Sequence, residues 1–196
     1  MKLFKHLKHS VLVSVVFLIL CGLGFPMLMT GISQVIFPHQ ANGSLIEYEG
    51  KAIGSEHVGQ DFNEPYFMKA RPSAVGYNTD EEVVDVASGS NNYGPSNELL
   101  KERVQKDMDE FLKQNPDVKK EDIPTDLLTA SGSGLDPHIS IESARIQIPA
   151  LSKASGIKES ELETIVQENT EGKWLGIFGE DVVNVLKVNL EIAKRL

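Results

Sequence analysis

Apolar positions are continuous near the start of the chain and are interspersed with polar positions everywhere else. No Asp, Glu, Lys or Arg occurs from His9 to Ile46. About 20 apolar residues span the hydrocarbon layer of a bilayer as a helix, and residues 11–37 exceed that length. Pro and Gly are tolerated in such helices, so we expect Pro26 to kink the helix without ending it. The pattern predicts a transmembrane anchor over residues 11–37. The apolar residues assigned to it are Val11, Leu12, Val13, Val15, Val16, Phe17, Leu18, Ile19, Leu20, Leu23, Phe25, Met27, Leu28 and Met29.

Two kinds of processed leader are alternatives to a retained anchor. A cleaved signal peptide has an apolar core of about 7–15 residues followed by a small-residue cleavage site, and no such site closes this run. A lipoprotein signal places a small residue directly before the modified cysteine, whereas Leu20 precedes Cys21. Both comparisons favour a retained anchor in which Cys21 faces lipid or packs against a neighbour.

The lysines before the apolar run predict its orientation. Short basic flanks of a transmembrane helix stay in the cytoplasm, so Lys2, Lys5 and Lys8 indicate a cytoplasmic tail over residues 1–10. Residues 38–196 then form one domain on the outer side. Removing the three lysines from the 19 basic residues leaves 16 against 28 acidic ones, so the outer domain is acidic.

Several short segments of the outer domain have the pattern of β-strands. Leu45–Glu47 and Lys51–Ile53 are joined by a Gly-containing turn and predict a hairpin. Tyr66–Lys69 predicts a further short strand. Val182–Ile192 is rich in Val and alternates apolar with polar residues, which favours a strand at the end of the chain.

Helical spacing is clearest after the polar stretch Ser88–Asn97, which has loop chemistry throughout. Ser96 or Asn97 is expected to cap a helix that ends near Asn115. Its apolar positions recur at helical spacing and are Leu100, Val104, Met108, Phe111 and Leu112.

Two further helices are expected in the second half of the chain. Residues 141–155 predict a helix interrupted at Pro149, and a second helix begins at Lys158 or Ser160. The mixed order of short strands and helices indicates an α+β domain, without the regular alternation of a doubly wound sheet.

The charge and the cysteine content exclude whole classes of function. A formal charge of −9 disfavours nucleic-acid binding, which depends on Lys and Arg. The single cysteine excludes an intramolecular disulfide and a site built from several thiolates.

Motifs that suggest chemistry each have a simpler interpretation. The loop Ser131-Gly132-Ser133-Gly134 resembles a phosphate cradle but lacks the P-loop lysine, so a packed turn is preferred. The histidines at 39, 57 and 138 lack the spacing of metal ligands, and Asp136 is expected to serve as a turn or cap residue. Residues 150–169 have a helix-turn-helix rhythm, but the second helix is acidic and a structural αα-hairpin is favoured. No motif gives strong grounds for a bound cofactor.

Blocks of sequence along nearly the whole chain resemble the C subunit family of bacterial Kdp potassium-transporting ATPases. The blocks are QANGSLI (40–46), GQDF (59–62), YFMKARPSA (66–74), SGSNNYGPSN (88–97), TASGSGLDPHIS (129–140), QIPALSKA (147–154) and VVNVLKVNL (182–190). Each block is weakly specific by itself, but their order and spacing together are family-like.

The resemblance implies a non-catalytic subunit of a potassium-uptake complex in the bacterial inner membrane. The implied partners are a channel-like potassium-binding subunit, a P-type subunit that hydrolyses ATP, and a small membrane peptide. The family is described as a catalytic chaperone that raises the ATP affinity of the P-type subunit. ATP is therefore implied by the family alone, and the predicted orientation separates the outer domain from cytoplasmic nucleotide. An anchored ligand-binding or sensor domain is the alternative.

Polar residues in the loops are the candidates for partner contact. Loops on a rigid scaffold commonly carry function, and here they either shape the domain or contact the potassium-binding subunit. The candidates are Arg71, Ser73, Ser90, Asn91, Asn92, Ser131, Ser133 and Asp136.

Overall fold

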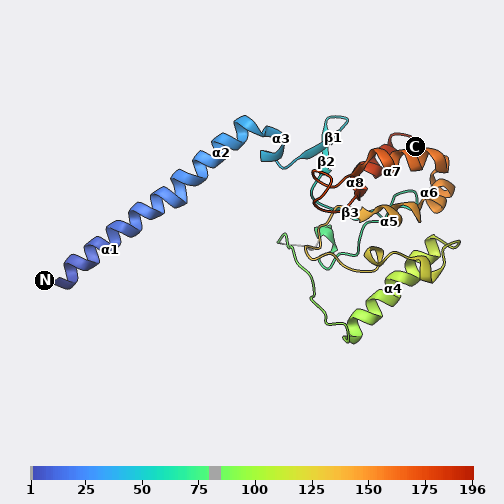
Figure 1. Cartoon of the computed structure of the whole chain (residues 1–196), viewed down its shortest axis with the longest axis horizontal. Helices are drawn as coiled ribbons and strands as arrows, with labels where there is room; N and C mark the ends of the chain where they lie inside the picture. Colours follow the sequence, from blue (N-terminus) through green and yellow to red (C-terminus); the bar gives the residue numbers. More distant parts are fainter. Residues whose placement is uncertain (1, 80–84) are drawn as a thin grey trace. The chain divides into compact units, whose positions relative to one another are not determined.

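The computed structural model describes residues 2–79 and 85–196. The chain forms two compact units, one ending at Leu45 and one comprising Ile46–Leu196. Figure 1 shows a long helix in the first unit, and short strands with several helices in the second. The structure confirms the α+β class.

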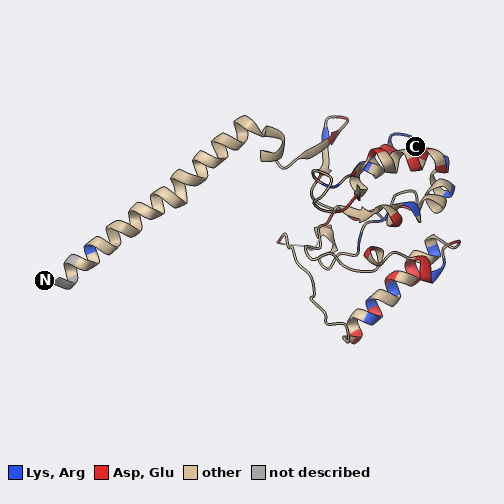
Figure 2. Ribbon diagram, in the orientation of Figure 1, with Lys and Arg blue, Asp and Glu red and all other residues tan. Residues whose placement is uncertain are grey.

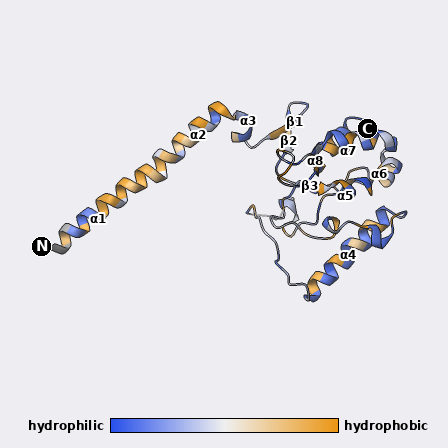
Figure 3. Cartoon of the chain, in the orientation of Figure 1, coloured by the Kyte–Doolittle hydropathy of each residue, from blue (hydrophilic) through white to orange (hydrophobic). Residues whose placement is uncertain are grey.

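The first unit is a nearly continuous helix. It comprises α1 (Lys2–Ile19), a π-helical turn η1 (Leu20–Gly24) and α2 (Phe25–Ile36), followed by the short α3 (Pro38–Ala41). Within the described residues, His6–Ile36 is the one helical stretch long and apolar enough to cross a membrane. At 1.5 Å per residue it is about 46 Å long, and Figure 3 shows its hydrophobic colouring.

The expected irregularity at Pro26 lies one turn earlier than predicted. Proline has no N–H, and its ring collides with the carbonyl four residues before it. In the π-helical turn the Phe25 amide instead bonds to the Leu20 carbonyl, five residues back. The wider turn admits Pro26 within the first turn of α2, so the helix continues through it.

The predicted hairpin is confirmed as β1 (Leu45–Tyr48) and β2 (Lys51–Ser55), which pair in a two-stranded sheet. Glu49 and Gly50 form its turn with φ of 51° and 76°. Positive φ at both central residues matches the right-handed twist of a hairpin.

The strand predicted at Tyr66–Lys69 is wrong. This irregular segment forms hydrogen bonds to buried side chains and not to another strand. The Met68 amide donates to Asn189 Oδ1 at 2.7 Å and the Met68 carbonyl accepts from Asn189 Nδ2 at 2.9 Å. The Lys69 amide donates to Gln147 Oε1 at 2.8 Å. A one-turn 3₁₀ helix, η2 (Gly76–Asn78), follows.

The longest helix of the second unit is α4 (Glu98–Gln114). As predicted, Ser88–Asn97 is a loop, and Asn97 caps the helix by accepting from the Leu99 amide at 2.9 Å. Figure 2 shows basic and acidic residues interspersed along α4. Two 3₁₀ turns follow, η3 (Lys120–Asp122) and η4 (Thr125–Leu127). The buried side chains here form the α4 cluster: Met108, Phe111, Ile123 and Leu127.

The helices of the second half lie where they were predicted, and the first of them is divided in two. β3 (His138–Ser140) leads into α5 (Ile141–Arg145), then come α6 (Ile148–Ser155) and α7 (Glu159–Glu168). The expected break falls before Pro149, which sits in the first turn of α6, where a missing N–H costs nothing. Gly156 ends α6 with φ of 77°. The predicted αα-hairpin is confirmed as α6 and α7.

The strand predicted over Val182–Ile192 is largely wrong. Only β5 (Val182–Asn184) is extended, and α8 (Val185–Ala193) follows. The Asn184 side chain caps α8 by accepting from the Lys187 amide at 3.1 Å. The buried positions of α8 are 185, 186, 188, 189 and 192, which is helical spacing. Several of these apolar positions also fit the alternation of a strand, which is why a strand was predicted.

A three-stranded antiparallel sheet has the order β3-β5-β4, where β4 is Thr170–Glu171. Ile139 pairs with Val183 across β3 and β5. Helices α5 to α8 pack with this sheet around a larger core, here called the C-terminal cluster. Its buried members are Met68, Ile139, Ala144, Ile148, Leu151, Ile157, Leu162, Ile165, Val166, Val183, Val185, Val188 and Ile192.

Candidate functional site

Five of the eight candidate loop residues lie around an ion pair between Arg71 and Asp136. Arg71 Nη1 lies 2.9 Å from Asp136 Oδ2, and both side chains are about a quarter exposed. Arg71 Nη2 donates to the Thr129 carbonyl at 3.4 Å. Arg71 Nε is buried and has no hydrogen-bond partner among the described residues. The pair joins two loops that are 65 residues apart in the sequence.

Asp136 also organises the start of β3. Its Oδ1 accepts from the His138 amide at 3.0 Å and lies 3.6 Å from His138 Nδ1. Burial by itself raises the pKa of Asp136, but hydrogen bonds from His138 and Arg71 outweigh burial and hold that pKa below its ordinary value. Asp136 is therefore a turn residue, as predicted, and also the acidic partner of Arg71.

Ser73 connects the Arg71 loop to the glycine-rich loop through hydrogen bonds. Its hydroxyl donates to the Gly134 carbonyl at 2.6 Å and accepts from the amides of Val75 and Tyr77 at 3.2 and 3.0 Å. Gly134 has φ of +68°, and a Cβ there would lie 2.8 Å from the Gly89 carbonyl oxygen. Three loops thus converge so closely that only glycine fits at this position.

Two backbone amides at the end of the glycine-rich loop donate hydrogen bonds to serine hydroxyls of the same loop. The Gly134 amide donates to Ser131 Oγ at 2.9 Å, and the Leu135 amide donates to Ser133 Oγ at 3.1 Å. These amides do not converge on an open anion site. The packed turn preferred from the sequence is the arrangement observed.

Tyr77 completes the cluster and was not singled out from the sequence. Its hydroxyl donates to the Arg71 carbonyl at 2.6 Å. Burial, followed by the nearby carboxylates of Asp136 and Asp61, raises the pKa of Tyr77. A Cβ at Gly59 would lie 2.6 Å from both the Tyr77 ring and the Asp136 carbonyl oxygen. No local motif marks Tyr77 or Gly59, because their partners are distant in the sequence.

The remaining candidates lie at the edge of the cluster or outside it. The Gly89 amide donates to the Ser133 carbonyl at 2.7 Å, so the first part of the Ser88–Asn97 loop is hydrogen-bonded to the glycine-rich loop. Ser90 Oγ accepts from the Asn92 amide at 3.5 Å, while Asn91 and Asn92 are exposed. The structure thus brings Arg71, Ser73, Ser131, Ser133 and Asp136 together and leaves the two asparagines at the surface.

A polar pocket of about 380 Å³ lies between the Arg71 loop and α4. Its lining includes Asp61, Lys69, Arg71, Asp107 and Glu110. Burial lowers the pKa of Lys69, although Asp61 and Glu64 oppose this effect, and its ammonium donates to the Phe62 carbonyl. Among the described residues, no group of three or more His, Cys, Asp and Glu side chains is placed to hold a metal ion.

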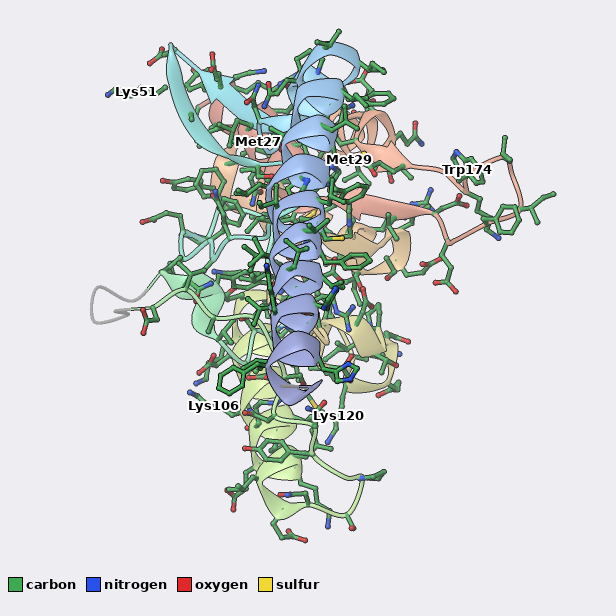
Figure 4. The ribbon with its side chains drawn as sticks, turned by 90° about the vertical axis from the view of Figure 1, so that its left-hand side faces the viewer. Met27, Met29, Lys51, Lys106, Lys120 and Trp174 are labelled. Atoms are coloured by element: carbon green, nitrogen blue, oxygen red, sulfur yellow. The ribbon has the colours of Figure 1, made fainter. Side chains whose placement is uncertain are left out.

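The predicted anchor residues form a separate feature. From Val11 to Met29 their side chains are exposed, and large members such as Phe17 and Met27 are 60% and 72% exposed. Figure 4 shows Met27 and Met29 on this helix, together with the other side chains of the chain. An apolar helix with no buried face within its own unit is typical of a segment that is covered by lipid or by other helices.

Comparisons with known proteins cover almost the whole chain. A family profile described as "KdpC: K+-transporting ATPase, c chain" matches residues 7–194. A relative from Clostridium kluyveri, called potassium-transporting ATPase KdpC subunit, is 62% identical over 98% of this chain and 95% of its own length. Relatives with the same description from Clostridioides difficile and Bacillus cereus are 57% and 45% identical, and each alignment covers 98% of the relative.

Proposed function

This chain belongs to the KdpC family of potassium-transporting ATPase subunits, and from that premise we propose that it is a non-catalytic accessory subunit that assembles and stabilises the complex. Its transmembrane helix anchors it in the bacterial inner membrane. Its partners are the potassium-binding subunit, the ATP-hydrolysing P-type subunit and the small membrane peptide. The proposal is supported by one helix that is long and apolar enough to cross a membrane, together with a polar domain that forms a separate compact unit.

The proposed topology rests on the basic residues at the amino terminus. Lys2, Lys5 and Lys8 favour a cytoplasmic tail, and residues 38–196 are acidic by 28 carboxylates to 16 basic side chains. The folded domain then lies outside, across the membrane from cytoplasmic ATP. An effect of this subunit on ATP affinity is accordingly exerted through assembly of the complex and not through direct contact with nucleotide.

Protease treatment of intact spheroplasts tests the topology. We expect digestion of the domain without lysis, since residues 38–196 face outward. The cytoplasmic tail should be cut only after lysis. Protection of the domain in intact spheroplasts would show that the domain faces the cytoplasm, where it could contact ATP directly.

Purification through a tag on the ATP-hydrolysing subunit tests the assembly role. The full chain should be recovered with the complex, and its omission should lower both the recovery of the complex and its ATPase activity at limiting potassium. Replacing residues 11–37 with an unrelated transmembrane helix separates the contribution of the anchor from that of the domain. Normal complex formation without this chain would contradict the proposal.

The polar pocket beside Arg71 is the observation that favours a second candidate function, a ligand-binding domain that acts alone. A domain of that kind binds a small ligand without its partners. The full chain purified alone would then show a shift in unfolding temperature with a small ligand, whereas an assembly subunit is stabilised by the other subunits.

A further inference from the structure

Four large apolar side chains lie exposed in residues 174–178, the middle of the ten-residue loop (172–181) between β4 and β5. Trp174, Leu175, Ile177 and Phe178 are 70%, 70%, 76% and 59% exposed. Figure 4 shows Trp174 on a loop that extends away from the strands. Among the described residues, Leu99 is an exposed apolar residue that stands singly, which is normal for a protein surface. A cluster of this kind marks an interaction site.

The loop has an internally hydrogen-bonded conformation. The Trp174 amide donates to the Phe178 carbonyl at 2.8 Å, and the Phe178 amide donates to the Trp174 carbonyl at 3.0 Å. The Trp174 and Phe178 rings lie 5.7 Å apart. The Lys173 amide donates to Asp181 Oδ1 at 3.1 Å, which closes the base of the loop. A preformed loop loses little conformational entropy on binding, which favours affinity.

The charges beside the loop distinguish two kinds of partner surface. In the sequence, Glu171, Glu180 and Asp181 flank it with one basic residue, Lys173. Lys187 pairs with Glu171 at 3.3 Å, so Glu180 and Asp181 provide the negative charge that remains beside the loop. Anionic lipid headgroups attract basic segments, so this acidic surround disfavours insertion into an anionic bilayer. It complements a protein groove that is apolar at its base and basic at its rim. Trp is also enriched among the residues that dominate protein interfaces.

We infer that residues 174–178 form a docking knob that inserts into an apolar, basic-rimmed groove on another subunit of the potassium-transporting complex. The inference deepens the proposed function and rests on it. It supplies a definite contact surface for the assembly role. The Arg71 cluster is internally bonded, whereas the knob presents apolar side chains outward.

Co-purification of variants with the tagged ATP-hydrolysing subunit tests the knob. Trp174→Ser with Ile177→Ser should lower recovery of the full chain about tenfold, since truncating an interface anchor has effects of that size or larger. Leu99→Ser, at a side chain that is 56% exposed on α4, is the matched control and should leave recovery unchanged. Equal recovery of wild type and the double variant would overturn the inference. Failure of the wild type itself would instead refute the proposed assembly role.

Photo-crosslinking keeps the test decisive where the double variant is less stable than the wild type. A benzophenone side chain at Leu175 should form an adduct with another subunit, whereas the same probe at Leu99 should not. Absence of an adduct at position 175 in an assembled complex would overturn the inference.

The single tryptophan of the chain tests contact with lipid directly. The full chain is reconstituted alone into vesicles of phosphatidylcholine and phosphatidylglycerol with brominated acyl chains. Trp174 emission should not be quenched relative to vesicles without bromine. Strong quenching would show insertion into the bilayer and overturn the assignment of a protein groove.

Discussion

The C-terminal cluster and the α4 cluster differ in both burial and context. In the C-terminal cluster, Val183 and Ile192 have no exposed surface, and helices pack against a sheet. The four members of the α4 cluster retain 6–9% exposure, and one amphipathic helix there packs against turns and loops. We therefore expect most of the stability of the domain to come from the C-terminal cluster, while α4 depends on a smaller local contact.

A matched pair of leucine truncations tests this comparison with the largest expected effect. Leu162→Ala should lower the free energy of unfolding by about 2–5 kcal/mol, because Leu162 is 1% exposed in a close-packed core. Leu127→Ala should cost less, because the surrounding turns can relax into the space. Urea unfolding of the full chain in detergent, followed by circular dichroism, measures both. Equal losses would show that the two clusters are equivalent.

A buried amide tests how the C-terminal cluster holds the irregular segment near Met68. Asn189→Ala removes the bonds of 2.7 and 2.9 Å to the Met68 backbone and leaves two buried polar groups unpaired. The expected loss is about 2 kcal/mol or more in the same urea assay. Asn91→Ala, at an exposed loop position, is the control and should have little effect. A neutral Asn189→Ala would contradict the structural role assigned to this side chain.

Two aspartates with opposite pKa directions give the smallest and most specific test. Hydrogen bonds hold the pKa of Asp136 low despite burial, whereas burial raises the pKa of Asp107 despite the nearby Arg103. A lowered pKa contributes stability above the unfolded value of about 3.9, and the contribution is lost as the pH falls through the folded pKa. The contribution of Asp107 to stability has the opposite pH dependence. Its folded pKa is raised, so stability increases as the pH falls and the carboxylate becomes protonated.

Asp136→Asn should therefore destabilise the chain by about 1 kcal/mol at pH 7, and its difference from wild type should shrink toward pH 3. Asp107→Asn should have a smaller effect at pH 7, because the neutral form is the one that burial favours. Unfolding free energies measured at several pH values check both signs. A constant penalty for Asp136→Asn across that range would assign its role to shape and not to charge.

Sequence reasoning succeeded where a signal is local. The apolar run predicted the long helix, and Asn97 with apolar spacing predicted α4. The hairpin followed from its Gly-containing turn. Each of these elements is determined by residues within one segment.

The failures arose where distant residues decide the structure. Residues 182–192 contain apolar positions that fit both a strand and a helix, and packing against α7 and the sheet selected α8. The Met68 backbone pairs with the Asn189 side chain and not with a strand. At the candidate site, polar loops predicted Arg71 and Asp136 individually, but their pairing across 65 residues has no local signature. Tyr77 and Gly59 were missed for the same reason.

The bond between Met68 and Asn189 has a consequence for the order of synthesis. The two residues are 121 positions apart, and Asn189 lies in the last helix of the chain. Residue 68 leaves the ribosome long before its partner exists, so the start of the domain stays incomplete until residue 189 has been synthesised. Closing so long a loop is slow compared with forming local helices. Packing around Met68 is thus completed by α8, and the domain matures only after α8 has been made.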